Sequence, residues 1–235
     1  LMIKSEFFIQ LVGAAFFLIL NIYLSKMGFS DPEIANFISY RFLAVILLAF
    51  PLGIYIKGKP LKPFFIVGAL GVPIVAIAIV IAIKYNYHLF LPLLFVFWGF
   101  VFTLFQVSSL PYIMRNTTVS NQSHAISLSY STHSFGAIFS GLLIFVCGQF
   151  MTEIDEGKIL LAISIIGFIS TYYLFKIKID VVEPSKMGIQ WKSYDWSLLV
   201  KAIFPTLIIA VGAGLTIPFI NLFFFHNFKT DSSTF

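Results

Sequence analysis

Long apolar stretches, separated by short polar segments, follow one another along the whole chain. None of these stretches has the polar face that a helix on the surface of a soluble protein carries. Because about 20 apolar residues cross the hydrocarbon core of a bilayer, each stretch predicts a membrane-spanning helix. The seven predicted spans cover residues 7–24, 34–56, 64–83, 89–114, 125–148, 159–175 and 197–225.

The turn between the second and third spans predicts how the chain is oriented. Residues 53–63 are broken by glycine and proline and carry Lys57, Lys59 and Lys62, and lysines in such a loop mark the cytoplasmic side. On this assignment the cytoplasmic side also gains Lys4, Arg115, Lys176, Lys178, Lys186, Lys192 and Lys201, whereas the other side holds Lys26, Lys84, Lys158 and Lys229. The asymmetry predicts a cytoplasmic N-terminus and a C-terminus outside.

The composition indicates the same class of protein. Hydrophobic residues make up 59% of the chain and charged residues 11%, whereas an ordinary soluble domain is about 25% charged. The net charge of +5 needs no nucleic-acid partner, because basic loops facing anionic lipid account for it. Cys147 is the single cysteine, which excludes a disulfide framework and a cysteine-based metal site. We therefore expect a multi-pass protein in contact with the lipid bilayer, without a metal or other cofactor.

Two segments resemble motifs of the major facilitator superfamily of secondary transporters. Gly53-x4-Gly58-Lys59 lies where that family has its Gly-x3-Asp-Arg-x-Gly-Arg-Arg loop, with Lys57 in the place of the acidic residue. Residues 211–221, with two glycines and a proline, are similar to the broken seventh span of many members. The family's arginine signature in span 4 is replaced by Gln-Val-Ser-Ser at 106–109, and the Gly-Pro signature of its antiporters is not seen in span 5.

The resemblance implies an all-α membrane fold of two six-helix bundles, with the substrate bound between them near the midplane and reached from alternate sides. It divides this chain into an N-terminal six-helix bundle at 1–178, a cytoplasmic linker at 179–197 and the first helix of the C-terminal half at 198–235. Residue 1 is Leu, and the chain stops where an outer loop would lead to an eighth span. We therefore expect a longer polypeptide, whose missing C-terminal half is a partner of this one.

Two ionisable residues, Arg41 and His133, lie well inside the predicted spans rather than at their ends, where an unpaired charge is expensive. Arg41 lies about two turns in from the outer end of span 2. It either snorkels to the interface, pairs with a backbone carbonyl, or binds an anionic group of the substrate. His133 is either a neutral packing residue or a proton relay. Lys4 and Glu6 precede the first predicted span, and no Asp or Glu falls inside any of the seven. A coupling proton would therefore bind to His133 or to a residue of the missing half.

Four uncharged polar residues belong to the spans that line the substrate cavity in the family. They are Asn21 in span 1, Gln106 in span 4, and Thr216 and Asn221 in span 7. Each can hydrogen-bond a polar solute, or instead join two helices at roughly 1 kcal/mol per contact.

The leading hypothesis is secondary active or facilitative transport of a small-molecule substrate across an inner cell membrane. The alternative is a seven-helix receptor or retinal-type protein, because seven spans are visible. The predicted cytoplasmic N-terminus argues against a receptor, and Lys201 lies at the end of span 7 rather than in its middle, where a retinal Schiff base would need it. A membrane enzyme is disfavoured, because the sequence has no paired carboxylates or histidine cluster at an interface.

Overall fold

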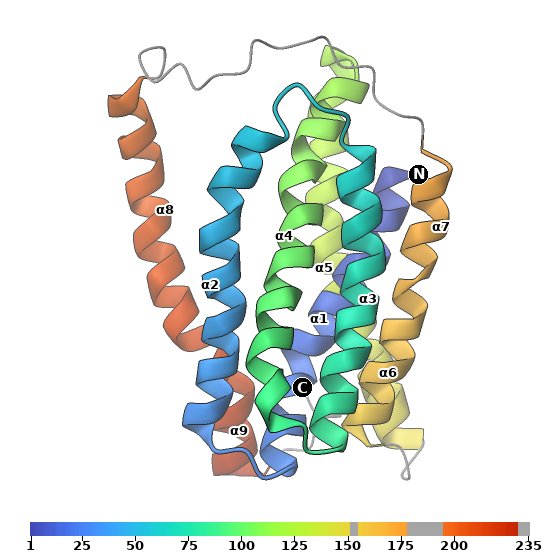
Figure 1. The fold of residues 1–235 in the computed structure, drawn as a ribbon, viewed down its shortest axis with the longest axis vertical. Coiled ribbons are helices and arrows are strands. Elements are labelled where there is room, and N and C mark those ends of the chain that lie inside the picture. The colour runs from blue at the N-terminus through green and yellow to red at the C-terminus, as the bar shows by residue number, and fades with distance from the viewer. Residues whose placement is uncertain (151–154, 178–194, 230–235) are drawn as a thin grey trace.

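The computed structural model describes residues 1–150, 155–177 and 195–229. Within these ranges the chain forms helices and no strand, and seven helical segments have the length and hydropathy needed to cross a membrane. They run up and down beside one another (Figure 1). The predicted all-α protein with seven apolar spans is therefore confirmed.

Each predicted span coincides with one helical segment. The elements are α1 (Met2–Lys26), α2 (Asp31–Tyr55), α3 (Lys62–Lys84), η1 (His88–Phe90), α4 (Leu91–Asn116), α5 (Val119–Phe150), α6 (Glu156–Gly167), α7 (Ile169–Phe175), α8 (Trp196–Thr216), η3 (Ile217–Phe219) and α9 (Ile220–Phe228). The first span begins at Met2 rather than at residue 7. The sixth consists of α6 and α7, and η3 breaks the seventh. The linker predicted at 179–197 falls largely on residues 178–194, outside the described residues.

The start of α2 shows how local sequence sets a helix end. The backbone N–H and the hydroxyl of Ser30 both donate to Glu33 Oε2, at 2.8 and 2.7 Å. The Ser30 side chain also accepts from the Glu33 backbone N–H, and with the Ser30 N–H bond this forms a capping box, which satisfies backbone donors at the first turn. Pro32 stands in the same turn, where its missing N–H has no helical partner to lose.

Helix α1 lies at the centre of the bundle. It packs against α2, α3, α5, α6 and α7, whereas α4 packs against α2, α3 and α5. α3 completes the bundle by packing against α6 and α7. Ile9, Val12 and Ile19 of α1 are completely buried. Burial of apolar side chains from every turn of one helix explains why α1 has no polar face.

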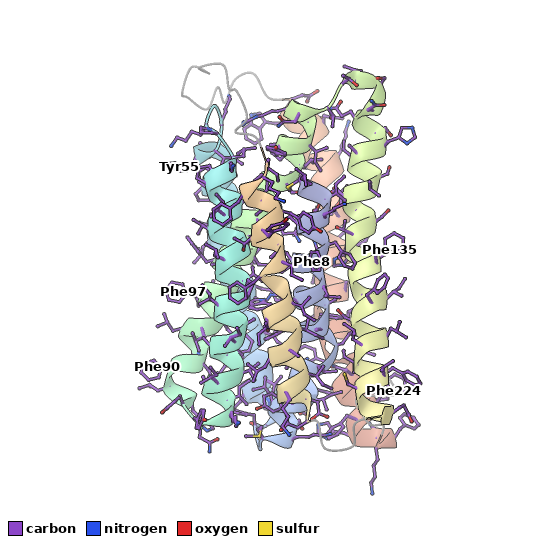
Figure 2. The ribbon with its side chains drawn as sticks, turned by 90° about the vertical axis from the view of Figure 1, so that its right-hand side faces the viewer. Phe8, Tyr55, Phe90, Phe97, Phe135 and Phe224 are labelled. Atoms are coloured by element: carbon purple, nitrogen blue, oxygen red, sulfur yellow. The ribbon has the colours of Figure 1, made fainter. Side chains whose placement is uncertain are left out.

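The outward faces of the helices are apolar as well. Phe90, Phe97 and Phe135 point away from the bundle (Figure 2). Ile46 of α2 is 73% exposed and Leu215 of α8 is 74% exposed. Apolar surface on this scale needs a partner or a membrane to cover it, which agrees with the predicted multi-pass class.

The two ends of the bundle differ in charge. We call one of them the basic end, because it carries Lys57, Lys59, Lys62, Arg115 and Lys176. At the other end, which we call the opposite end, Lys26 Nζ lies 2.5 Å from Glu156 Oε1 and joins α1 to α6. The basic end is at the top of Figure 1, together with the N-terminus.

The seventh span contacts the bundle unevenly. α8 leans away from α2 toward the basic end (Figure 1), and its described side chains other than that of Ala213 are exposed. After η3, α9 packs against α1 at the opposite end and buries Asn221 and Leu222. The seventh span is thus attached to the bundle mainly at the opposite end.

Candidate functional site

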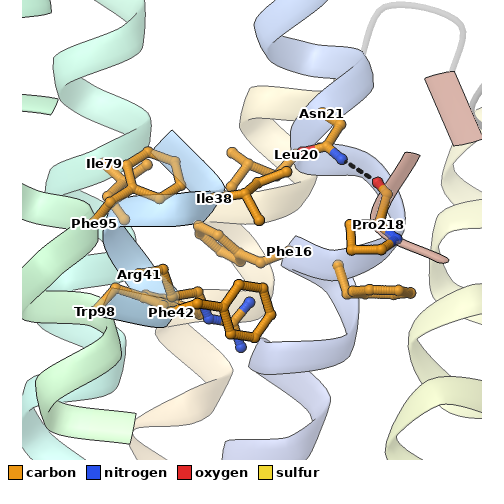
Figure 3. A pocket seen from close by; sticks show the side chains of 11 residues that line it. Phe16, Leu20, Asn21, Ile38, Arg41, Phe42, Ile79, Phe95, Trp98 and Pro218 are labelled. Carbon is orange, nitrogen blue, oxygen red and sulfur yellow. Dashed lines mark hydrogen bonds between the residues drawn. The ribbon is translucent and has the colours of Figure 1, made fainter. Parts of the chain in front are cut away.

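A small pocket lies between α1, α2 and α4, beside the break in the seventh span (Figure 3). Its volume of about 40 Å³ suits a few waters or one small charged group, because a water needs at least about 10–15 Å³. We call it the Arg41 pocket, after the one charged residue in its wall. The wall consists of Phe16, Phe17, Leu20, Asn21, Ile38, Arg41, Phe42, Ile79, Phe95, Trp98 and Pro218.

Arg41 is half-buried and surrounded by aromatic rings. Its Cζ lies 5.6 Å from the centroid of Phe42, 5.8 Å from that of Trp98 and 5.5 Å from that of Phe102. These distances are within the range of cation–π attraction. Among the described residues the guanidinium has no hydrogen bond or ion pair, so the predicted alternative of pairing with a backbone carbonyl is not observed there.

The depth of Arg41 bears on the snorkelling alternative. Because α2 begins at Asp31, Arg41 lies about 15 Å along the helix from the opposite end, at a rise of about 1.5 Å per residue. The first turn of α2 carries the exposed Asp31 and Glu33; counted from Ile34, where the apolar run begins, Arg41 lies about two turns in, as the sequence predicted. In the structure the guanidinium of Arg41 lies against Trp98 and Phe102 of α4, and so it is directed toward the neighbouring helix.

Gly99 of α4 allows α2 to approach at the level of Arg41. A Cβ atom at Gly99 would lie 2.2 Å from the Arg41 carbonyl oxygen and 2.9 Å from Ala44 Cβ. Contacts this short do not occur, so only glycine fits here. The close approach brings Trp98, the neighbour of Gly99 in α4, beside the Arg41 side chain. Arg41 thereby receives its aromatic surroundings from a facing helix as well as from its own.

Two asparagines join α1 to the break in the seventh span. Asn21 Nδ2 donates to the Pro218 carbonyl oxygen at 2.6 Å (Figure 3). Asn221 Nδ2 donates in return to the Leu18 carbonyl oxygen at 2.9 Å. In both segments the asparagine follows the accepting residue by three positions, so the two hydrogen bonds are reciprocal. We call this pair the asparagine bridge, and it lies between Arg41 and the opposite end.

The break at η3 makes the asparagine bridge possible. The Leu222 N–H donates to Asn221 Oδ1 at 2.9 Å, whereas in an uninterrupted α-helix it would donate to the carbonyl four residues earlier. That carbonyl belongs to Pro218, which accepts from Asn21 instead. The amide of Asn221 therefore uses its oxygen within α9 and its nitrogen toward α1, as an amide with both functions can.

Of the six residues predicted to line a substrate cavity, the structure brings Asn21 and Arg41 into one pocket and places Asn221 next to it. Gln106 is exposed on α4 and does not line this pocket. Thr216 Oγ1 donates to a carbonyl of its own helix, that of Gly212, at 3.0 Å. The predicted set is thus divided between the Arg41 pocket and separate positions.

His133, the sixth candidate, lies toward the basic end on α5. Its Nδ1 is 3.2 Å from Oε1 of Gln10 on α1. Nearby, Ser140 Oγ donates to the Leu11 carbonyl at 2.8 Å, and Gly136 lies against the backbone of Gln10. His133 is itself exposed, so its contact with Gln10 is compatible with either of the two predicted roles, packing or proton relay.

A buried carboxylate was missed by the sequence reasoning. The Glu6 side chain is 3% exposed, although the predicted first span began after it. Ser109 Oγ of α4 donates to Glu6 Oε1 at 3.1 Å, and Ser129 Oγ of α5 donates to Oε2 at 2.7 Å. The expectation that no Asp or Glu lies inside a span is therefore wrong, because α4 and α5 enclose the first turns of α1. The signal was the helical spacing that puts Glu6 on the buried face with Ile9 and Gly13.

The basic loop at residues 53–63, which resembles the motif of the transporter family and was expected to move with the conformational change, is anchored by cations that bind carbonyls. Lys62 Nζ donates to the carbonyl of Phe175 at 3.0 Å and to that of Ile177 at 2.5 Å. These are unsatisfied carbonyls at the C-terminal end of α7, where a positive charge is favourable. Arg115 Nη1 donates in turn to the Lys59 carbonyl at 2.8 Å. Lys62 and Arg115 thus tie the two sides of this loop to the neighbouring helices α7 and α4.

The remaining residues of this loop have simpler settings. Gly58 has a φ of 71°, a left-handed conformation that favours glycine. Lys59 Nζ lies 3.1 Å from the ring centroid of Tyr55, and the side chain of Lys57 is exposed. Gly53 belongs to the last turns of α2 and has open space where a Cβ would be. The local turn therefore depends on Gly58, whereas Gly53 meets no steric requirement for glycine.

Comparison with known proteins adds no family to this geometry. A scan against models of protein families finds no match, and a search of curated proteins finds none either. Within the described ranges, no group of three or more His, Cys, Asp and Glu side chains is placed to hold a metal ion. The function must therefore be inferred from the pocket, the asparagine bridge and the arrangement of the helices.

Proposed function

We propose that this protein is a secondary active or facilitative transporter that moves a small solute by rocker-switch alternating access, on the plan of the major facilitator superfamily. The observation that carries the proposal is the asparagine bridge. The first and seventh spans run in the same direction and exchange the same pair of groups with the same spacing. An approximate twofold axis along the membrane normal relates the first helices of two such transporter halves, and reciprocal contacts are what that symmetry produces.

The packing inside the bundle supports the same proposal. If spans 1, 2 and 3 are exchanged for spans 4, 5 and 6, the contact of α1 with α5 becomes that of α4 with α2. The contact of α1 with α6 and α7 likewise becomes that of α4 with α3. Consecutive spans alternate in direction, so this exchange relates two units of inverted topology. Nested three-helix repeats of this kind occur within each half of the transporters of this superfamily.

The uneven contacts of the seventh span fit a transporter open to one side. α9 is held at the opposite end by the asparagine bridge, and α8 leans away toward the basic end (Figure 1). With the basic end in the cytoplasm, as the lysine distribution favours, this is an inward-open arrangement. Transport then requires the bridge to open when the basic end closes.

The proposal is tested by removing the bridge and measuring access to the pocket. A cysteine introduced by Ile38→Cys, in a Cys147→Ser background, reports access of a membrane-impermeant maleimide from the opposite end. Two helix-joining hydrogen bonds are together worth about 1–3 kcal/mol. We therefore expect the double variant Asn21→Ala/Asn221→Ala to raise the labelling rate from that side by about tenfold, since about 1.4 kcal/mol is a factor of ten.

Asn227→Ala is the matched control, because Asn227 Nδ2 donates to a carbonyl of its own helix, that of Phe223, at 2.9 Å. This variant removes an asparagine from α9 without touching α1, so its labelling rate should equal that of the parent. If the double variant also labels at the parental rate, the bridge does not control access and the proposed mechanism is wrong.

A further inference from the structure

Arg41 is a cation near the middle of the membrane-spanning region without a counter-charge among the described residues. Its five N–H donors form no hydrogen bond there, although the three rings of Phe42, Trp98 and Phe102 attract the charge. Ring attraction of about 0.5–2 kcal/mol is smaller than the penalty for a charge at this depth, about 2.5–3.5 kcal/mol on the lowest scale. A ligand that accepts hydrogen bonds from the guanidinium would therefore stabilise the charge further.

The pocket offers space for that acceptor next to Arg41. Its volume is about 40 Å³, enough for a carboxylate group but not for a whole solute. Asn21 contributes an amide to the same wall, and the apolar side chains of Phe16 and Phe95 line the rest (Figure 3). A planar, two-oxygen anion matches the guanidinium best, because arginine donates to carboxylates through two parallel N–H groups.

The charge of the ligand follows from the charge of the wall. Arg41 is the one charged residue that lines the pocket, so a monoanion is neutralised there and a dianion would bring an uncompensated charge into the membrane. We propose that the Arg41 pocket binds the carboxylate group of a small organic monoanion. This inference rests on the proposed transport function and names its substrate class: a small monocarboxylate with an apolar body, to suit the apolar side chains around Arg41.

The proposal is tested by ligand binding to the purified protein in detergent. Trp98 is 2% exposed and stands beside Arg41, so a variant with Trp191→Phe and Trp196→Phe reports on the pocket through one fluorophore. Benzoate is titrated against benzamide, its uncharged analogue, at constant ionic strength. We expect a saturable change in Trp98 emission with benzoate and binding at least about tenfold weaker with benzamide.

Substitutions of Arg41 assign the effect to the guanidinium. Arg41→Gln should abolish the benzoate response, and Arg41→Lys, which keeps the charge but loses the two-pronged geometry, should weaken it by about tenfold. Lys84→Gln removes an exposed cation from the last turn of α3, at the opposite end, and should leave the titration unchanged. The emission maximum of Trp98 and the elution volume in size-exclusion chromatography show whether each variant is folded. If Arg41→Gln does not fold, Arg41→Lys still tests the proposal.

Three results would overturn the carboxylate assignment: equal binding of benzoate and benzamide, an undiminished response in Arg41→Lys, or chloride displacing benzoate at the same concentration as acetate does. The titration requires no movement of solute across a membrane. A negative titration together with the expected maleimide labelling would therefore reject the anion site alone. Failure of the labelling experiment with positive titration would reject the transport mechanism and leave a carboxylate-binding membrane protein.

Discussion

Glu6 shows that a charged side chain near the start of a span can be a core residue. It accepts one hydrogen bond from α4 and one from α5, so each carboxylate oxygen has a donor from a different helix. The adjacent Ser5 hydroxyl lies 2.6 Å from that of Ser170 on α7. Polar pairs of this kind hold the first turns of α1 to three neighbouring helices, and they fix the rotation of α1 within the bundle.

Replacing Glu6 should therefore reduce stability in a way that depends on what replaces it. Glu6→Ala leaves two serine hydroxyls without partners, and we expect a loss of about 2–4 kcal/mol in the free energy of unfolding. Glu6→Gln keeps an acceptor for one serine and a donor for the other, so its loss should be about 1 kcal/mol or less. Unfolding in mixed micelles measures both variants. Equal stability of Glu6→Ala and the parent would show that the network contributes nothing.

Residues of this kind were the hardest to predict from the sequence. The predicted first span began only at residue 7, because a hydropathy window ends at the charges of Lys4 and Glu6. The burial of Glu6 is decided by α4 and α5, more than 100 residues away in the chain. Arg41 was found because it stands alone inside an apolar run. The asparagine bridge was not predictable as a pair, because its partners are about 200 positions apart and neither acceptor is a side chain.

At the scale of the elements, the contact between α2 and α4 depends on one missing methyl group. Gly99 of α4 faces the Arg41 carbonyl of α2 too closely for any Cβ. Gly141 of α5 is a glycine in a similar helical setting with open space around it. Comparing substitutions at the two positions therefore distinguishes the effect of close helix contact from the general effect of glycine on helix stability.

We expect Gly99→Ala to lower the free energy of unfolding by about 1–3 kcal/mol, because α2 must move away from α4 to admit the methyl group. Gly141→Ala should be neutral or stabilising by up to about 1 kcal/mol, since alanine is the better helix former. The same unfolding assay compares them. A Gly99→Ala protein as stable as Gly141→Ala would show that α2 and α4 are not constrained at this point.

The elements themselves were largely predictable from the sequence. Hydropathy is a local property, so all seven spans follow from short windows of residues. The break in the seventh span was expected from the resemblance of residues 211–221 to a broken span. Helix ends were less predictable: α5 begins at Val119 rather than at residue 125, because polar residues continue a helix beyond the apolar run. Which face of each helix is buried depends on its neighbours, and that required the structure.

At the scale of the whole molecule, the lysine distribution and the lean of α8 must be considered together to say which side of the membrane the bundle opens toward. The basic end carries the 53–63 loop, and α8 leans away from the bundle on that side (Figure 1). If the basic end is cytoplasmic, the structure is open inward. If the orientation were reversed, the same arrangement would be outward-open, and the proposed transport cycle would start from the other side.

Cysteine labelling in whole cells decides the orientation. In a Cys147→Ser background, Lys84→Cys at the opposite end should react with an impermeant maleimide added outside. Lys57→Cys at the basic end should react only after the membrane is opened. Both positions are exposed, so a difference between them reflects the membrane and not burial. Reaction of Lys57→Cys in intact cells, with Lys84→Cys protected, would reverse the assigned topology.

The asparagine bridge has a consequence for how the protein tolerates mutation. Both acceptors are main-chain carbonyls, those of Leu18 and Pro218, and no side-chain replacement can delete a main-chain oxygen. Substitutions at position 18 should therefore leave the asparagine bridge intact as long as the helix persists. A substitution of Asn21 or Asn221 should break it unless the new side chain has an N–H donor that reaches as far. Sensitivity of the bridge to single substitutions is thus confined to two side chains, those of Asn21 and Asn221.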